Sequence, residues 1–281
     1  MHDSATIVWT QHFDLHSHST NSDGEHSVEF VAGLMKENGV QVWSLTDHDT
    51  IAGWKTGEQS ANTLDMTFIP GVEITCERGM EPYADELRRN KRERASRSWH
   101  LLAYFPNLKH TDNHAIKFAR WLKPLQENRL PRMKKMVKNL TELGMPVTFD
   151  EVLAKADGSV GRPHLADVMV DKGYVESKFE AFEQWIGDGL PAHVAQPKPT
   201  IAEAVSMVQQ CGGITSLAHP LYYGIPPSEL GKYCLDVGID SIEAFHRSHS
   251  DGYRFELWNI CRELGLRVSC GSDFHGQTYG Q

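Results

Sequence analysis

Two histidines separated by one residue, His16 and His18, open the part of the sequence that can carry chemistry. In an extended segment, side chains two residues apart point the same way, so both imidazoles can reach one cation. Asp23 follows in the same polar stretch. Imidazole and carboxylate groups are ligands for divalent transition metals. A single histidine pair of this kind is more often structural, so a metal site needs further partners elsewhere in the chain.

Further histidines and carboxylates lie at or just past the ends of predicted strands. They are His48, Glu73, His100, His219, Asp273 and His275. Charged groups are rarely left near a buried centre unless they are paired or bound to metal. Since different structural units deliver these residues to one end of the fold, the set as a whole predicts a metal centre.

The elements that must position these residues follow an alternating pattern. Short apolar runs predict strands, and helices are predicted after Ser27, after the capping box at Thr200, and around residues 254–264. The predicted strands are 13–14, 40–45, 68–74, 99–105, 214–218, 239–245 and 266–270. Strands that alternate with helices favour an α/β fold with a parallel sheet or barrel, whose chemistry lies past the carboxyl ends of the strands.

The middle of the chain departs from this pattern. Residues 111–199 read as helices and turns, with a capping box at Thr148, and we predict a helical subdomain inserted at the barrel mouth. The barrel itself is then formed by residues 11–110 and 200–281. Within it, the charge-dense stretch 78–98 is predicted to be an exposed excursion.

Composition limits the classes of function. With 281 residues, 40% of them hydrophobic and 23% charged, the chain is expected to form one globular core with an insertion. It has no apolar run of the length that spans a bilayer and no Lys or Arg in its first ten residues, so no membrane association and a cytoplasmic location are expected. Five scattered cysteines argue against a disulfide framework, and a net charge of −9 against a stable complex with long nucleic acid.

The motifs together resemble those of the PHP (polymerase and histidinol phosphatase) family. The matching segments are Asp14–His18, Ser22–Gly24, Thr46–Thr50, Pro70–Ile74, Ala218–Pro220 and Gly271–His275. The Ser-Asp-Gly triplet and the segment Gly161–His164 look most like the branch that contains nucleoside 3′,5′-bisphosphate phosphatases and a 5′-to-3′ exoribonuclease. The resemblance spans nearly the whole chain.

The resemblance implies a distorted seven-stranded (β/α) barrel with three divalent metal ions, commonly Mn, Zn or Fe. By motif, one ion would be bound by His16, His18, Glu73 and Asp273. A second would share Glu73 and add His100 and His219. The third would be bound by Asp23, His48 and His275.

This ligand set predicts phosphoester hydrolysis. The ions outweigh the ligand carboxylates in charge, so a bridging hydroxide and a phosphate are the expected guests. Asp49 and His275 are the predicted catalytic side chains; Asp49 would orient a ligand or handle a proton, although a turn cap explains it equally well.

Substrate recognition is expected from the insertion. Arg129, Arg132, Arg162 and His164 are candidates for phosphate contacts, against the alternative of an exposed basic helix face. A nucleoside 3′,5′-bisphosphate or the 5′ end of a short RNA is the predicted substrate.

Three other functions stay open on the sequence. The chain can be a phosphatase for histidinol phosphate or another small metabolite, or a non-catalytic metal-binding module. An amidohydrolase-like barrel also uses paired histidines, but it is expected to place a metal-bridging lysine at a strand end, and none of the predicted strand ends carries one.

Overall fold

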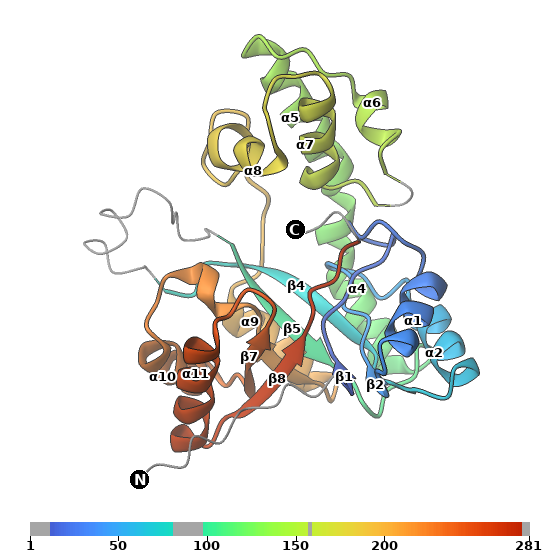
Figure 1. Cartoon of the computed structure of the whole chain (residues 1–281), viewed down its shortest axis with the longest axis vertical. Helices are drawn as coiled ribbons and strands as arrows, with labels where there is room; N and C mark the ends of the chain where they lie inside the picture. Colours follow the sequence, from blue (N-terminus) through green and yellow to red (C-terminus); the bar gives the residue numbers. More distant parts are fainter. Residues whose placement is uncertain (1–11, 81–97, 157–158, 277–281) are drawn as a thin grey trace.

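The computed structural model describes residues 12–80, 98–156 and 159–276 (Figure 1). Most of the charged stretch predicted to be an excursion, residues 81–97, lies outside these ranges. In the described part of the chain, no helix is long and apolar enough to cross a membrane.

The first sheet is small and parallel. It consists of β1 (Phe13–Asp14), β2 (Val42–Trp43) and β3 (Thr67–Phe68), in that order. Two helices connect these strands, α1 (Val28–Glu37) and α2 (Trp54–Thr63). The hydroxyl of Ser27 caps α1 by accepting a hydrogen bond from the amide of Phe30 at 3.3 Å, as the sequence predicts. The helices and the sheet share one apolar cluster that includes Val31, Trp43 and Leu45.

The second sheet has five strands in chain order. They are β4 (Gly71–Glu77), β5 (Ser98–Tyr104), β6 (Ile214–Leu217), β7 (Ser241–His246) and β8 (Arg267–Gly271). Helices α9 (Ile201–Gln210), α10 (Pro227–Val237) and α11 (Asp251–Leu264) alternate with the last three strands, and a 3₁₀ turn, η2 (Pro220–Tyr223), follows β6.

One strand of this sheet runs against the predicted direction. β5 is antiparallel to both β4 and β6, whereas β6, β7 and β8 are parallel. A parallel neighbour needs a crossover connection, and β5 instead pairs directly with β4, the strand that precedes it in the described chain. The connection between β5 and β6 is long because it contains the insertion, so it permits either a parallel or an antiparallel pairing of these two strands. The sheet is therefore mixed rather than parallel.

Backbone hydrogen bonds also join the first sheet to both edge strands of the five-stranded sheet, β4 and β8. The amide of Leu15, after β1, donates to the carbonyl of Cys270 in β8 at 3.0 Å. The amide of Glu73 in β4 donates to the carbonyl of Thr46, after β2, at 3.0 Å. The α/β class is thus confirmed, but the paired strands form sheets of three and five, so the seven-stranded barrel stays a prediction.

The middle of the chain is helical and has its own core. Its helices are α5 (Arg129–Glu142), α6 (Phe149–Leu153), α7 (Arg162–Asp171), α8 (Lys178–Ala181) and the π-helical turn η1 (Phe182–Ile186). They surround an apolar cluster that includes Met136, Leu165 and Ile186 and stand together above the sheets (Figure 1). By contrast, α4 (Asn113–Glu127) buries Phe118 and Leu122 in the main core beside the five-stranded sheet.

Candidate metal centre

The loops after β1 and β8 lie side by side. Ser17 pairs with Phe274 in a parallel bridge, and the amide of His18 donates to the carbonyl of Phe274 at 2.8 Å. Because alternate residues of paired loops face the same way, His16 and His18 meet Asp273 and His275 from the other loop. Gly271 permits this approach, since a Cβ at that position would lie 2.2 Å from the Cβ of His16.

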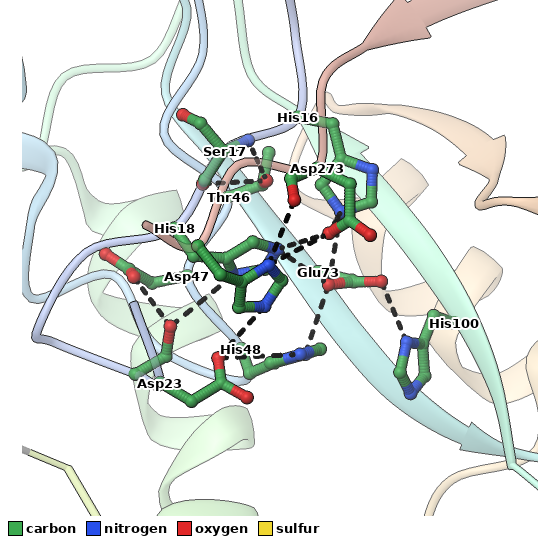
Figure 2. Close-up of polar contacts among 12 residues, drawn as sticks. His16, Ser17, His18, Asp23, Thr46, Asp47, His48, Glu73, His100 and Asp273 are labelled. Carbon is green, nitrogen blue, oxygen red and sulfur yellow. Dashed lines mark hydrogen bonds and ion pairs between the residues drawn. The ribbon is translucent and has the colours of Figure 1, made fainter. Parts of the chain in front are cut away.

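Glu73 stands at the centre of the cluster (Figure 2). Its Oε2 lies 3.2 Å from His16 Nε2, 3.1 Å from His18 Nε2 and 3.2 Å from His48 Nδ1. Its Oε1 lies 2.8 Å from His100 Nδ1 and 2.9 Å from His219 Nε2. The two oxygens of one buried carboxylate therefore face two different groups of imidazoles.

All the predicted metal ligands lie in this cluster. Three groups of ligand atoms each lie within 4.8 Å of one another. They are His16, His18, Glu73 and Asp273; His48, Glu73 and His100; and His18, Asp23, His48 and His275. In the last group, the Oδ1 of Asp23 lies 3.4 Å from His275 Nε2 and 3.8 Å from His48 Nε2.

Unpaired buried atoms show that the cluster fits cations. His16 Nε2, His18 Nε2 and Glu73 Oε2 are buried and make no hydrogen bond of regular geometry, although both imidazole nitrogens lie 3.1–3.4 Å from Glu73 and Asp273 oxygens. Such atoms are costly unless something satisfies them. They face one another instead of solvent, and their mixed nitrogen and oxygen chemistry suits Mn, Fe or Zn. The donor set thus fits divalent metal ions.

The charges of the cluster also favour cations. Burial works against protonation of His16, but the carboxylates of Glu243, Glu73 and Asp273 outweigh it and raise the pKa of the imidazole well above its usual value. At His18, burial is likewise outweighed by hydrogen bonds to Asp273 and Glu73, which raise the pKa to about 10. The carboxylates thus create a negative potential at the imidazoles, which keeps His16 and His18 protonated when no metal is bound.

We expect metal loading to release protons. A ligand imidazole must be neutral, so a cation displaces the protons that the raised pKa values of His16 and His18 retain at pH 7. Falling pH favours the protons, so Mn²⁺ affinity should rise between pH 6 and 8, by about tenfold per pH unit for each proton displaced. Competition with a chelator of known pH dependence measures it, and a flat affinity across this range would contradict the prediction.

Several buried residues that support the cluster were not predicted from the sequence. Asp47 accepts hydrogen bonds from the hydroxyls of Ser19 and Ser22, both at 2.7 Å, and so holds the loop that carries Asp23. Glu243 and His246 on β7 contact the cluster from the opposite side. An acidic residue and a histidine near the end of a predicted strand were the available signal, but β7 was assigned no site residue.

Asp49 lines the cavity beside the cluster, and its carboxylate contacts Thr75 and Arg129. Its Oδ1 accepts from the amide of Thr75 at 2.8 Å, and its Oδ2 accepts from the Thr75 hydroxyl at 3.1 Å and from Arg129 Nη2 at 3.0 Å. Its φ of 57° is left-handed. Both oxygens accept from residues far along the chain, so Asp49 holds Arg129 beside the cavity, and its roles in orienting a ligand, handling a proton or capping a turn stay predictions.

A cavity of about 390 Å³ joins the cluster to the insertion. Its walls include Glu73 and His219 from the sheets and Arg129, Arg132 and Arg162 from the insertion. His164 lies elsewhere: its Nδ1 accepts from the amide of Gly161 at 2.9 Å at the start of α7, and it lines a separate cavity of about 210 Å³. The structure thus brings the three predicted arginines, but not His164, to the cluster's cavity.

Taken together, the α/β fold, the cation-ready cluster and the basic wall of its cavity define a metal-dependent hydrolase. Comparison with known proteins specifies the class. The sequence matches the PHP domain over residues 14–127. It is 31% identical to a 5′-3′ exoribonuclease of Haemophilus influenzae over 95% of this chain and 90% of that protein. It is 27% identical to a 3′,5′-nucleoside bisphosphate phosphatase of Chromobacterium violaceum, over 95% and 88% of the two chains.

Solved structures agree. A protein of Chromobacterium violaceum, described as an amidohydrolase with bound sulfate, superposes with a TM-score of 0.81 at 26% identity, over 95% of this chain and 88% of that one. A metal-dependent phosphoesterase of Bifidobacterium adolescentis gives 0.75 at 27% identity, over 94% and 87%. The chain belongs to the PHP family, as its motifs predicted. It is accordingly a metal-dependent phosphohydrolase, which removes the non-catalytic alternative.

Proposed function

We propose that the chain hydrolyses phosphate monoesters of small nucleotides at a centre of three divalent cations. The observation that carries the proposal is the shared cavity, which is lined by imidazole and carboxylate residues of the cluster and by three arginines of the insertion. When bound, such cations supply a hydroxide at neutral pH and stabilise charge on the phosphoryl oxygens. The chain's own residues then need only hold the ester in line and balance its charge.

Glu73 is the proposed bridge between two of the cation sites. One site would use His16, His18, Asp273 and the Oε2 of Glu73, and the second His100, His219 and the Oε1. Asp23, His48 and His275 would hold the third. The short distances from His18 to Glu73 and from His48 to Glu73, 3.1 and 3.2 Å, support a compact cluster. Because it lines the cavity, His275 is also the proposed catalytic histidine.

We expect purified protein supplied with Mn, Fe or Zn to retain more than one equivalent of metal. The ligand atoms form more than one group, and a single tetrahedral or octahedral ion cannot use all of them. Elemental analysis against protein concentration, after removal of loosely bound ions, measures the ratio. One ion or fewer per chain would contradict a multinuclear centre.

A second anionic group of the substrate would meet Arg132. Its Nε donates to the carbonyl of Val194 at 2.8 Å, while its Nη2 is buried without a partner. Burial and the neighbouring Arg162 lower its pKa to about 10. Arg162 itself is paired with Asp188 at 2.6 Å, and Lys198 lies 3.6 Å from the same carboxylate. A phosphate would satisfy the free donors of Arg132 beside these cations.

The relatives narrow the substrate class. One is named a 5′-3′ exoribonuclease and the other a 3′,5′-nucleoside bisphosphate phosphatase, and both RNA and a nucleoside bisphosphate carry more than one phosphate. A cation cluster with a separate arginine wall suits a substrate with two phosphates better than it suits a monophosphate such as histidinol phosphate. Among the residues that the structure describes, Lys198 lines the cavity but pairs with Asp188, which disfavours it as the metal-bridging lysine expected of an amidohydrolase.

Comparing substrates tests the proposal. Rates at fixed Mn²⁺ and salt should be highest for a nucleoside 3′,5′-bisphosphate or a short 5′-phosphorylated RNA, and lower for a nucleoside 5′-monophosphate and for histidinol phosphate. Since the net charge of −9 repels long polyanions, lengthening the RNA should not increase the rate. If histidinol phosphate or a sugar phosphate were turned over most efficiently, the nucleotide assignment would fail while phosphoester hydrolysis would stand.

We also propose that the insertion caps the mouth of a closed barrel. The edge hydrogen bonds from Leu15 and Glu73 support closure of the two sheets, and Arg132 and Arg162 support the capping role. The packing of α4 into the main core suggests that the capping unit starts at α5 rather than at residue 111.

A further inference from the structure

β7 contributes none of the proposed metal ligands, yet two of its side chains are fully buried against them. Glu243 and His246 both have an exposed fraction of 0%. Buried ionisable groups are kept in proteins when they are paired and hydrogen-bonded. Their partners here are the proposed ligands themselves, which raises the question of what β7 does for the cluster.

A β-bulge places both residues on the same side of the strand. Along β7, Glu243 pairs with Ser269 and Phe245 with Cys270, so Ala244 is an extra residue without a counterpart in β8. In a regular strand, residues three apart point to opposite faces. The extra residue shifts the alternation, and Glu243 and His246 therefore both face the cluster. Bulges of this kind re-aim side chains beside active sites.

Glu243 holds two ligands at once. Its Oε1 lies 2.9 Å from Nδ1 of His16, and its Oε2 accepts from the backbone amide of His219 at 2.7 Å. The first contact keeps the proton of a neutral His16 on Nδ1 and leaves the Nε2 lone pair for a cation. The second holds His219 at a φ of 27°, a left-handed conformation that is costly for histidine.

His246 holds a third ligand. Its Nδ1 accepts from the amide of Ser248 at 3.2 Å, so its Nε2 carries the proton and can donate to Oδ2 of Asp273 at 3.3 Å. The other oxygen of Asp273, Oδ1, faces His16 at 3.4 Å and His18 at 3.3 Å. His246 thereby turns one oxygen of Asp273 away from the cluster and leaves the other directed into it.

We propose that β7 is the positioning strand of the metal centre, in which Glu243 orients His16 and His219 and His246 orients Asp273. The inference rests on the proposed metal centre but is independent of the substrate. Glu243→Gln tests the role of the carboxylate. A glutamine side chain has one acceptor oxygen, whereas two donors, the ring N–H of His16 and the backbone N–H of His219, need an acceptor. If the glutamine oxygen accepts from the backbone amide of His219, the glutamine NH₂ faces His16 Nδ1, and the proton of His16 must move to Nε2. In the reverse orientation, the glutamine NH₂ faces the backbone N–H of His219, so two donors meet.

The experiment measures Mn²⁺ affinity by chelator competition, together with the thermal midpoint and circular dichroism of the metal-free proteins. Glu243→Gln should bind Mn²⁺ about 10–100-fold more weakly, the usual effect of losing a partner that orients a ligand, with a metal-free midpoint close to that of the wild type. Asp14→Asn is the matched control. Asp14 is also a buried carboxylate beside His16, but its Oδ1 accepts from the backbone amides of His16 and Ser272, which an asparagine oxygen can still satisfy.

A second pair of variants tests His246 without altering Glu243. His246→Gln keeps a donor near Asp273 and should retain Mn²⁺ affinity within about threefold, whereas His246→Leu removes it and should lose about tenfold or more. The proposal is overturned if Glu243→Gln binds within threefold of the wild type, if Asp14→Asn loses as much, or if the two His246 variants behave alike. Should Glu243→Gln fail to fold, the His246 pair decides. A wild-type protein that binds no more than one ion would instead refute the multinuclear centre itself.

Discussion

Replacing Glu73 by alanine is expected to be the most damaging single change to a carboxylate in this protein. The side chain is 1% exposed, and its two oxygens face His16, His18 and His48 on one side and His100 and His219 on the other. Its removal should open two cation sites at once. Since bound metal is worth several kcal/mol of transition-state stabilisation, kcat/KM should fall by about 10³-fold or more.

Two further variants separate bridging from a general loss of charge. Asp23→Ala removes a carboxylate whose ion pairs are with His48 and His275 of one proposed site, so it should lose less metal and less activity. Glu73→Gln keeps the volume of the side chain and removes its charge, and should resemble Glu73→Ala in metal content. Elemental analysis and steady-state kinetics on the same preparations compare them. A greater loss of both metal and activity in Asp23→Ala would show that Glu73 is not the bridge.

The second large effect is expected at the arginine wall. Arg132→Ala should raise KM for a nucleoside bisphosphate and leave metal content unchanged, because Arg132 lines the cavity, has a buried Nη2 without a hydrogen-bond partner and contacts no proposed ligand. A hydrogen bond to a charged group contributes about 1.5–3 kcal/mol, so kcat/KM should fall by about 10–150-fold. Arg162→Ala should act in the same direction and additionally remove one of the ion pairs of Asp188, which keeps Lys198 nearby.

Lys135→Ala provides the control for this change. Lys135 is a cation on the same helix, α5, but its side chain is exposed and it does not line the cavity. Its removal should leave KM within about twofold, as most surface substitutions do. If Arg132→Ala left KM unchanged and lost metal, or if Lys135→Ala raised KM as much, the arginine wall would not be the site of a second phosphate.

The sequence by itself was sufficient for the chemistry of the centre and for its family. Histidines and carboxylates are needed wherever hard and borderline cations bind, and their positions after strands are local properties of the chain. His16, His18, Asp273 and His275 were therefore recognisable from motif and spacing, and the structure places them in two paired loops. Helix starts were equally local: the caps at Ser27, Thr148 and Thr200 are present as predicted.

The tertiary structure decided what depends on distant partners. The antiparallel direction of β5 follows from its pairing with β4 and β6, which no local pattern records. His164 was grouped with the arginines, but its Nδ1 accepts from the amide of Gly161 and it lines another cavity. The position of Asp49 beside His48 predicted that it orients a ligand or handles a proton, but its contacts with Thr75 and Arg129 could not be read from the sequence.

The supporting layer of the centre was the hardest to foresee. Glu243 and His246 are three residues apart, a spacing that places them on opposite faces of a regular strand. Only the bulge at Ala244, visible in the register of β7 against β8, brings both to the ligands. Residue type and local order indicate which residues can be ligands. Strand register and hydrogen-bond partners arise from packing between segments far apart in the chain, so they are visible only in the folded molecule.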